Sequence, residues 1–315
     1  MVRTVRHGLC SYGSTGFEFV ASFDSDAPII IAGADRMFRT LLCFALFAFG
    51  LALNPERISA NVNSHQLASE WFEVESYQNG PSASQVLALC EDLRSELFRV
   101  WGGNVIMSKW EPRCKIRLHP TRVSYVRKVG SNSGQTSGCS QIQLQSGKIV
   151  CREIDLLINL AGELPALPHE LTHVVLADKF RGKQPPHWLD EGIAMLADTT
   201  TKQNLHHRDC NEAIMSGRAI PIRQLVTLES FSSPQQMPAF YGQSLLLVRM
   251  LAERDSPHKV IEFANDSLNQ GMEAALKQHY AIDSIDHLEK AWRAYMFQPP
   301  TTKTRGSVVM VKFKP

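Results

Sequence analysis

A five-residue segment near the middle of the chain carries the residue types of a metal site. Residues 169–173 read HELTH, so two histidines stand four positions apart and Glu170 follows the first of them. On a helix, positions i and i+4 share one face, so His169 and His173 can reach one ion at the zinc–nitrogen distance of about 2.0–2.1 Å. Glu170 would then point toward a water molecule on that ion, where a carboxylate can act as general base. The alternative is a pair of partly buried structural histidines with a solvated carboxylate between them.

Glu191 is the third candidate ligand. It lies in the first turn of a second predicted helix, in the segment PHWLDEGIA at residues 186–194. A short loop, RGKQP at residues 181–185, separates the two helices, so an antiparallel arrangement would bring the Glu191 carboxylate opposite the histidines. The alternative is a carboxylate that stands near a helix N-terminus because the helix dipole favours it there.

Together, HELTH and HWLDEGIA resemble the gluzincin superfamily, in which a glutamate within an EG(I/L/F)A segment supplies the third ligand. The closer likeness is to the peptidase-MA-like families of bacterial proteins. It extends to FYGQSL at residues 240–245, which resembles the tyrosine-bearing helix of aminopeptidase-like gluzincins. The specific likeness covers about residues 167–251, and no motif of a characterised peptidase is found before residue 154. The resemblance implies one Zn²⁺ ion held by His169, His173 and Glu191.

The activity implied by the resemblance is that of a zinc-dependent peptidase. Glu170 would be the general base, and Tyr241 would donate a hydrogen bond to the oxyanion, although a tyrosine there can equally be a packing residue. The hairpin near residues 139–151 would act as an edge strand that binds an extended peptide by strand addition. Two other readings stay open. One is a non-catalytic or degenerate metal-binding interaction domain, and the other is a zinc hydrolase acting on a non-peptide amide or ester.

Several further polar residues lie close to the ligands in the sequence. Ligand histidines usually donate their second ring nitrogen to an oxygen atom, and Asp190, Asp198 and Thr172 are the candidates for that role. Three more histidines, His187, His206 and His207, could also meet a metal, but they are expected at the surface, because adjacent histidines face different directions on a helix. Cys210 has no base near it in the sequence and is expected to be structural.

The periodicities predict an α+β fold in which a small mixed or antiparallel sheet with one helix precedes a helical, zincin-type C-terminal half. Apolar residues recur at helical spacing over 82–101. Strands are expected at 114–118, 123–129 and 154–160, with a hairpin over about 140–150 whose turn lies at 146–148. The second half predicts helices at 167–180, 188–198, 206–216, 238–254, 257–268, 272–280 and 285–296.

The N-terminal region contains an unbroken apolar run of 13 residues at 41–53, preceded by Arg36 and Arg39. A bilayer crossing needs about 20 residues and a signal-peptide core roughly 7–15, so the run predicts a secretory signal with cleavage after Ala60. Its distance from Met1 indicates a true start at Met37. The alternative is a genuine N-terminus followed by a buried helix or a short uncleaved anchor. The signal predicts a secreted, periplasmic or cell-envelope protein with no stable membrane span after cleavage.

This interpretation divides the chain into three parts. Residues 1–60 form an extension with the signal peptide. Residues 61–300 form a single catalytic domain, with an α/β part at 61–162 and a helical part at 163–300. Residues 301–315 form a tail.

Five cysteines remain after the expected cleavage, so at least one must be unpaired. Cys139 and Cys151 flank the hairpin and could pair, which would leave Cys90 and Cys114 to pair by elimination; free buried thiols are equally compatible with the sequence. The charge is nearly balanced, with 33 basic and 31 acidic side chains. Nothing in that balance calls for nucleic acid or an anionic membrane. A peptide or protein substrate is the expected partner.

Overall fold

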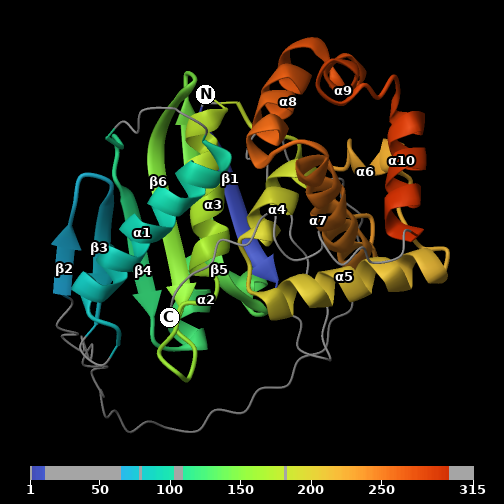
Figure 1. Ribbon diagram of the computed structural model, residues 1–315. Coiled ribbons are helices and arrows are strands. Elements are labelled where there is room, and N and C mark those ends of the chain that lie inside the picture. Colours follow the sequence, from blue (N-terminus) through green and yellow to red (C-terminus); the bar gives the residue numbers. More distant parts are fainter. Residues whose placement is uncertain (1, 11–64, 78–79, 103–108, 181–182, 298–315) are drawn as a thin grey trace, which may run out of the picture.

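The computed structural model describes residues 2–10, 65–77, 80–102, 109–180 and 183–297. These residues form a six-stranded mixed sheet followed by a predominantly helical half, which confirms the predicted α+β class (Figure 1). The strand order across the sheet is β1-β5-β6-β4-β3-β2. The strands are β1 (Val2–Cys10), β2 (His65–Ala68), β3 (Phe72–Ser76), β4 (Cys114–His119), β5 (Thr136–Gln145) and β6 (Lys148–Leu157).

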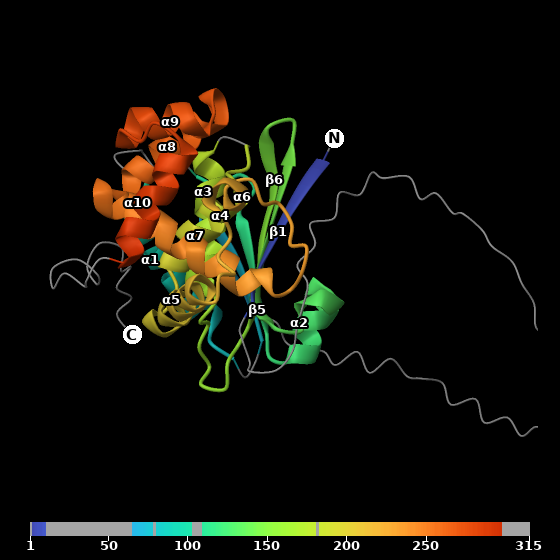
Figure 2. The ribbon, with the colours of Figure 1, turned by 90° about the vertical axis from the view of Figure 1, so that its right-hand side faces the viewer.

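Most of the helices come after the last strand of the sheet in the sequence. They are α1 (Ala83–Trp101), α2 (Arg122–Val129), α3 (Leu167–Lys179), α4 (His187–Leu196), α5 (Thr200–Met215), α6 (Ile222–Leu225), α7 (Gln236–Arg254), α8 (Pro257–Gln270), α9 (Met272–Tyr280) and α10 (Ile285–Phe297), with a 3-10 turn η1 (Ser131–Ser133). All the predicted helices of the second half are present, and the short α6 was not predicted. Figure 2 shows α2 on the opposite side of the sheet from α3, α4 and α7.

The β5–β6 hairpin was predicted and is confirmed, although β6 is one continuous strand rather than two. Its tight turn consists of Ser146 and Gly147, both with positive φ, 51° and 74°. Two consecutive positive φ angles match the right-handed twist of the strands that they join. β6 also pairs in parallel with β4, and β4 in parallel with β3, so the sheet is mixed.

The prediction of a strand over 123–129 was wrong, because this segment forms helix α2. Its apolar residues suggested a strand, but Thr121 begins a helix there: its hydroxyl accepts from the backbone N–H of Ser124, and Ser124 bonds back to the backbone N–H of Thr121. This reciprocal capping satisfies backbone donors that an isolated helix end leaves unpaired. Tyr125 is the buried residue of the helix.

Strand β1 changes the expected role of the hairpin. It runs antiparallel along β5 from Val2–Gln145 to Cys10–Thr136, so β5 lies inside the sheet and the edge belongs to β1. β1 comes from the segment that a start at Met37 would omit. The predicted signal core at 41–53 lies outside the described residues. Among the residues that are described, no helix is long and apolar enough to cross a membrane.

Neither predicted disulfide is formed in the described part of the chain, where Cys90 is not bonded to Cys114 and Cys139 is not bonded to Cys151. Cys139 faces Asp155 and Cys151 faces Gln143, so the first predicted pair does not lie opposite each other in the hairpin. Cys90 and Cys114 are both buried, and burial together with the neighbouring Cys90 raises the pKa of Cys114.

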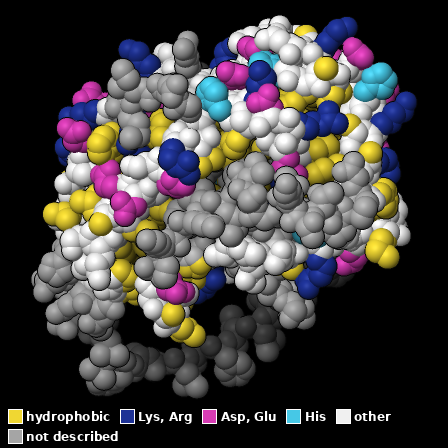
Figure 3. Space-filling model, viewed as in Figure 1, with side chains coloured by type: hydrophobic (Ala, Val, Ile, Leu, Met, Phe, Trp, Pro, Cys, Tyr) yellow, Lys and Arg dark blue, Asp and Glu magenta, His cyan; other side chains and the backbone are white. Residues whose placement is uncertain are grey.

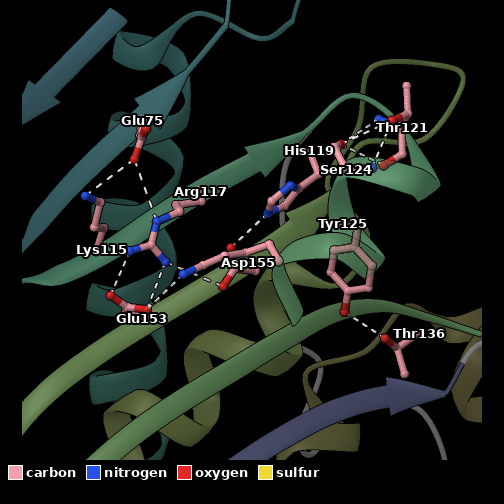
Figure 4. Close-up of polar contacts among 11 residues, drawn as sticks. Glu75, Lys115, Arg117, His119, Thr121, Ser124, Tyr125, Thr136, Glu153 and Asp155 are labelled. Carbon is pink, nitrogen blue, oxygen red and sulfur yellow. Dashed lines mark hydrogen bonds and ion pairs between the residues drawn. The ribbon is translucent and has the colours of Figure 1, made fainter. Parts of the chain in front are cut away.

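The face of the sheet that carries α2 is polar. Arg117 on β4 forms a bidentate pair with Glu153 on β6 at 2.7 and 2.8 Å, and beside it His119 pairs with Asp155 at 2.8 Å (Figure 4). Cross-strand pairs of opposite charge stabilise a sheet face that is only partly covered. On the face of the molecule seen in Figure 3, acidic and basic side chains are interspersed, as the balanced composition predicts.

The start of β5 is anchored from the same side. The hydroxyl of Tyr125 lies 2.7 Å from Oγ1 of Thr136, the first residue of β5 (Figure 4). The guanidinium of Arg122 donates to the backbone carbonyl of Thr136. Helix α2 therefore holds the end of β5 from which the chain continues to Gly138.

Candidate metal centre

Helices α3 and α4 carry the three candidate ligands. Helix α3 begins at Leu167 with Pro168 in its first turn, where a missing backbone N–H costs nothing. His169, Glu170 and His173 follow within two turns and are buried. Helix α4 begins after Pro186, so that Glu191 also lies early in its helix and is buried. The two prolines explain why the helices start where they do.

The side chains of His169, His173 and Glu191 converge as predicted. One ligand atom from each lies within 4.8 Å of the other two. Nε2 of His169 is 3.5 Å from one carboxylate oxygen of Glu191, and Nε2 of His173 is 4.0 Å from the other. Ligand atoms arranged tetrahedrally about Zn²⁺ are about 3.3 Å apart, given bonds of about 2.0–2.1 Å. The cluster is therefore close to the geometry of a tetrahedral centre, and it could hold a metal ion.

Two of the three predicted supporting residues contact the histidines. Nδ1 of His169 lies 3.2 Å from Asp198, and Nδ1 of His173 lies 3.1 Å from Asp190. Each bond fixes a ring so that its Nε2 faces Glu191, which is how second-sphere carboxylates orient ligand histidines. Thr172 has a different role, because its hydroxyl donates to the carbonyl of Pro168 within α3.

The pKa of His169 depends on its pairing with Asp198. Burial alone would lower its pKa, but the charge and hydrogen bond of Asp198, together with Glu191 and Glu170, raise the pKa of His169 to about 10. Burial would raise the pKa of Asp198, and the nearby His169 outweighs burial and lowers it. The two groups thus favour an imidazolium–carboxylate pair, and a metal ion at Nε2 must displace a proton.

Glu170 lies against strand β5 at a glycine. A Cβ atom at Gly138 would stand 2.7 Å from Cγ of Glu170 and 2.8 Å from its Oε1, so any side chain there would collide with the carboxylate. Gly138 thus allows β5 to pass directly beside the candidate general base. Glu170 itself is fully buried.

Helix α7 packs on α4 at a second glycine and brings Tyr241 to this region. A Cβ at Gly192 would lie 2.6 Å from the backbone oxygen of Ser244, so the two helices approach backbone to backbone without room for a methyl group. Tyr241 precedes Ser244 by three residues and lies on the same side of α7. Its ring packs against Phe240, Phe231 and the ring of His206, and the side chain is buried.

His206 was expected at the surface, and that expectation was wrong. It is only 4% exposed, and its ring lies 6.1 Å from that of Tyr241. Burial lowers the pKa of His206 to about 4, against an opposing effect of Asp198. The sequence contained a signal for this: His206, Cys210 and Ala213 follow helical spacing and form the buried side of α5. Cys210 is buried and structural, as predicted.

His187 was also expected at the surface and is only 17% exposed in its side chain. It is the first residue of α4 and lies beside Glu191. His207, by contrast, is partly exposed, as its position next to a buried histidine requires.

Comparison with known proteins agrees with this geometry. A family model described as the Peptidase MA superfamily matches residues 147–298. The matched segment runs from the turn before β6 to just past the end of α10 and includes the three candidate ligands, Glu170 and Tyr241. This match confirms the resemblance to gluzincin-like metallopeptidases. A search of curated proteins found no match to the chain.

The substitution Asp198→Asn tests the pairing that raises the pKa of His169. It removes the largest of the charges that oppose burial, while Glu191 and Glu170 remain, so we expect the pKa of His169 to fall from about 10 toward the ordinary histidine value of about 6.5. The measurement is an NMR titration of the imidazole signals in chelator-treated protein. Asp266→Asn is the matched control, because Asp266 pairs with His279 at 2.7 Å on α8 and α9. An unchanged His169 titration in Asp198→Asn would contradict the assignment.

Proposed function

We propose that this protein is a zinc-dependent peptidase of the gluzincin type, in which His169, His173 and Glu191 hold one Zn²⁺ ion. The observation that carries the proposal is the buried convergence of two imidazoles and one carboxylate, each imidazole oriented by its own aspartate. Two nitrogen donors and one oxygen donor are a typical ligand set of catalytic zinc, which keeps a fourth position for water. Zinc in such a site acts as a Lewis acid and lowers the pKa of water toward about 7.

Glu170 is the proposed general base. It follows His169 directly and is buried beside β5, so its carboxylate can accept the proton of the attacking water and pass it to the departing amine. Tyr241 is the proposed hydrogen-bond donor to the oxyanion that forms at the scissile carbonyl. Its location on the α4-facing side of α7 supports this role.

The substrate we propose is a peptide or protein bound in extended form near Gly138, where β5 passes closest to Glu170. One side of β5 pairs with β6 and the other side pairs with β1. A peptide can therefore add to β5 as a strand only after β1 has left. A signal peptide ending at Ala60, with a start at Met37, would remove β1 from the mature protein. Export to the cell envelope or beyond is therefore part of this proposal, and it is supported by the apolar run at 41–53.

Glu170→Gln tests the general base directly. We expect turnover of a peptide library to fall about a thousandfold, while one zinc ion per chain is retained, because the amide cannot accept the proton. The measurements are peptide cleavage by mass spectrometry, with and without a chelator, and metal content. Glu212→Gln on α5 is the control, since Glu212 pairs only at the surface with Arg218.

Two results would contradict the proposal for Glu170. Protein without zinc, despite intact His169 and His173, would refute the metal centre. A zinc-loaded protein whose turnover is the same with Glu170→Gln would indicate a metal-binding interaction domain instead of a peptidase.

Tyr241→Phe tests the oxyanion donor. Loss of the hydroxyl should lower kcat by about 10²–10³ with zinc content unchanged, because the donor acts on the transition state. Tyr280→Phe, which alters a buried tyrosine on α9, should leave kcat unaffected. If Tyr241→Phe retains wild-type kcat, Tyr241 is a packing residue.

Removal of residues 1–36 tests the role of β1. A chain that starts at Met37 lacks β1 and should show KM values for extended peptides about tenfold lower, because a tethered strand competes at millimolar effective concentration. Adding back a synthetic peptide with the sequence of residues 2–10 should inhibit the shortened enzyme. Identical KM values for the two chains, with no inhibition by the peptide, would show that peptides do not pair with β5.

A further inference from the structure

His187 lies at the margin of the candidate metal centre and takes no part in it as a ligand. It stands four residues before Glu191 on α4, so both side chains project from the same face of that helix. Its Nε2 is 3.8 Å from Oε1 of Glu191. The cluster whose ligand atoms lie within 4.8 Å of one another contains His169, His173 and Glu191 but not His187. His187 therefore approaches the centre with its Nε2 atom, which faces the Glu191 carboxylate.

The ring of His187 is held by aromatic neighbours. Phe240 on α7 lies 4.7 Å away with an interplanar angle of 35°, and Phe231 lies 6.0 Å away on the loop before α7. Phe240 is fully buried and Phe231 nearly so, which leaves the histidine ring little freedom to turn. Aromatic packing therefore fixes the direction in which Nε2 points.

The other ring nitrogen, Nδ1, bears on which tautomer of His187 faces Glu191. Nδ1 of His187 is buried and has no hydrogen-bond partner among the residues that the structure describes. A neutral imidazole carries one proton, and a lone pair on Nε2 would face the negative Glu191 carboxylate. The tautomer with hydrogen on Nε2 converts this repulsion into a charge-assisted hydrogen bond. At 3.8 Å the two atoms lie beyond hydrogen-bond distance, so this bond requires the ring and the carboxylate to approach to about 3.0 Å.

We propose that His187 is a positioning residue for the metal ligand Glu191. It donates from Nε2 to Oε1 of Glu191 and so keeps Oε2, the oxygen 3.5 Å from Nε2 of His169, directed at the ion. Each of the three ligands would then have a partner that orients it. Asp198 orients His169, Asp190 orients His173, and His187 orients Glu191. This inference rests on the proposed function, since it concerns the same zinc ion.

The test is the zinc affinity of the whole chain, measured by competition with a chelator at one fixed pH. His187→Phe keeps a ring for Phe240 to pack against and removes both nitrogens, and it should weaken zinc binding about 10- to 100-fold. His187→Gln returns a donor of similar reach and should recover most of that loss. The unfolding midpoint of chelator-treated His187→Phe should match the wild type, because the packing is retained.

A matched control lies on α8, where His258 stands four residues before Glu262 with Nε2 3.4 Å from its carboxylate. His258→Phe removes the same kind of pair outside the metal centre and should leave zinc affinity unchanged. Wild-type affinity in His187→Phe, or equally weak binding in His187→Phe and His187→Gln, would overturn the positioning role. Glu191→Ala in the same titration separates failure of the positioning role from failure of the zinc site. Wild-type zinc affinity in that variant would refute the proposed zinc site itself.

Discussion

Two buried hydrogen bonds between imidazole and carboxylate join α3 to the segment that starts with α4: His169 with Asp198, and His173 with Asp190. All four side chains are nearly excluded from solvent. A buried charge without a partner is costly, so each pair is stable only while α3 and α4 stay in register. The same bonds turn both Nε2 atoms toward Glu191. The stability of this helix pair and the geometry of the candidate centre therefore depend on one set of contacts.

Two close approaches at glycine complete the surroundings of this centre. At Gly138, β5 passes so near Glu170 that a Cβ atom would lie 2.7 Å from its side chain. At Gly192, α4 and α7 meet with Ser244 too close for any added methyl group. Both positions bring an element from elsewhere in the chain, the sheet or α7, into direct contact with the helix pair. A larger residue at either site would push that element away, since packed interiors have little room to yield.

Much of the architecture could be predicted from local pattern, and the errors have identifiable causes. The segment 123–129 has strand-forming residues, yet the reciprocal cap between Thr121 and Ser124 and the burial of Tyr125 under the sheet favour α2. The role of β5 as an edge strand was wrong because β1, far away in sequence, pairs along its whole length. Pairings between distant segments leave no local signal. Nor does hairpin register, which separates Cys139 from Cys151.

The sequence by itself placed the two candidate histidines together, because spacing along a helix is a local property: residues four apart share a face wherever the helix lies. Glu191 was added by the short loop between the helices and by the resemblance that EGIA carries, and the α+β class followed from periodicity. Only the tertiary structure decided which neighbours contact these three candidate ligands. It selected Asp190 and Asp198 over Thr172, buried His206 beside Tyr241, and turned His187 toward Glu191. Such choices depend on how helices pack in space, and a pattern within a single helix carries no information about them.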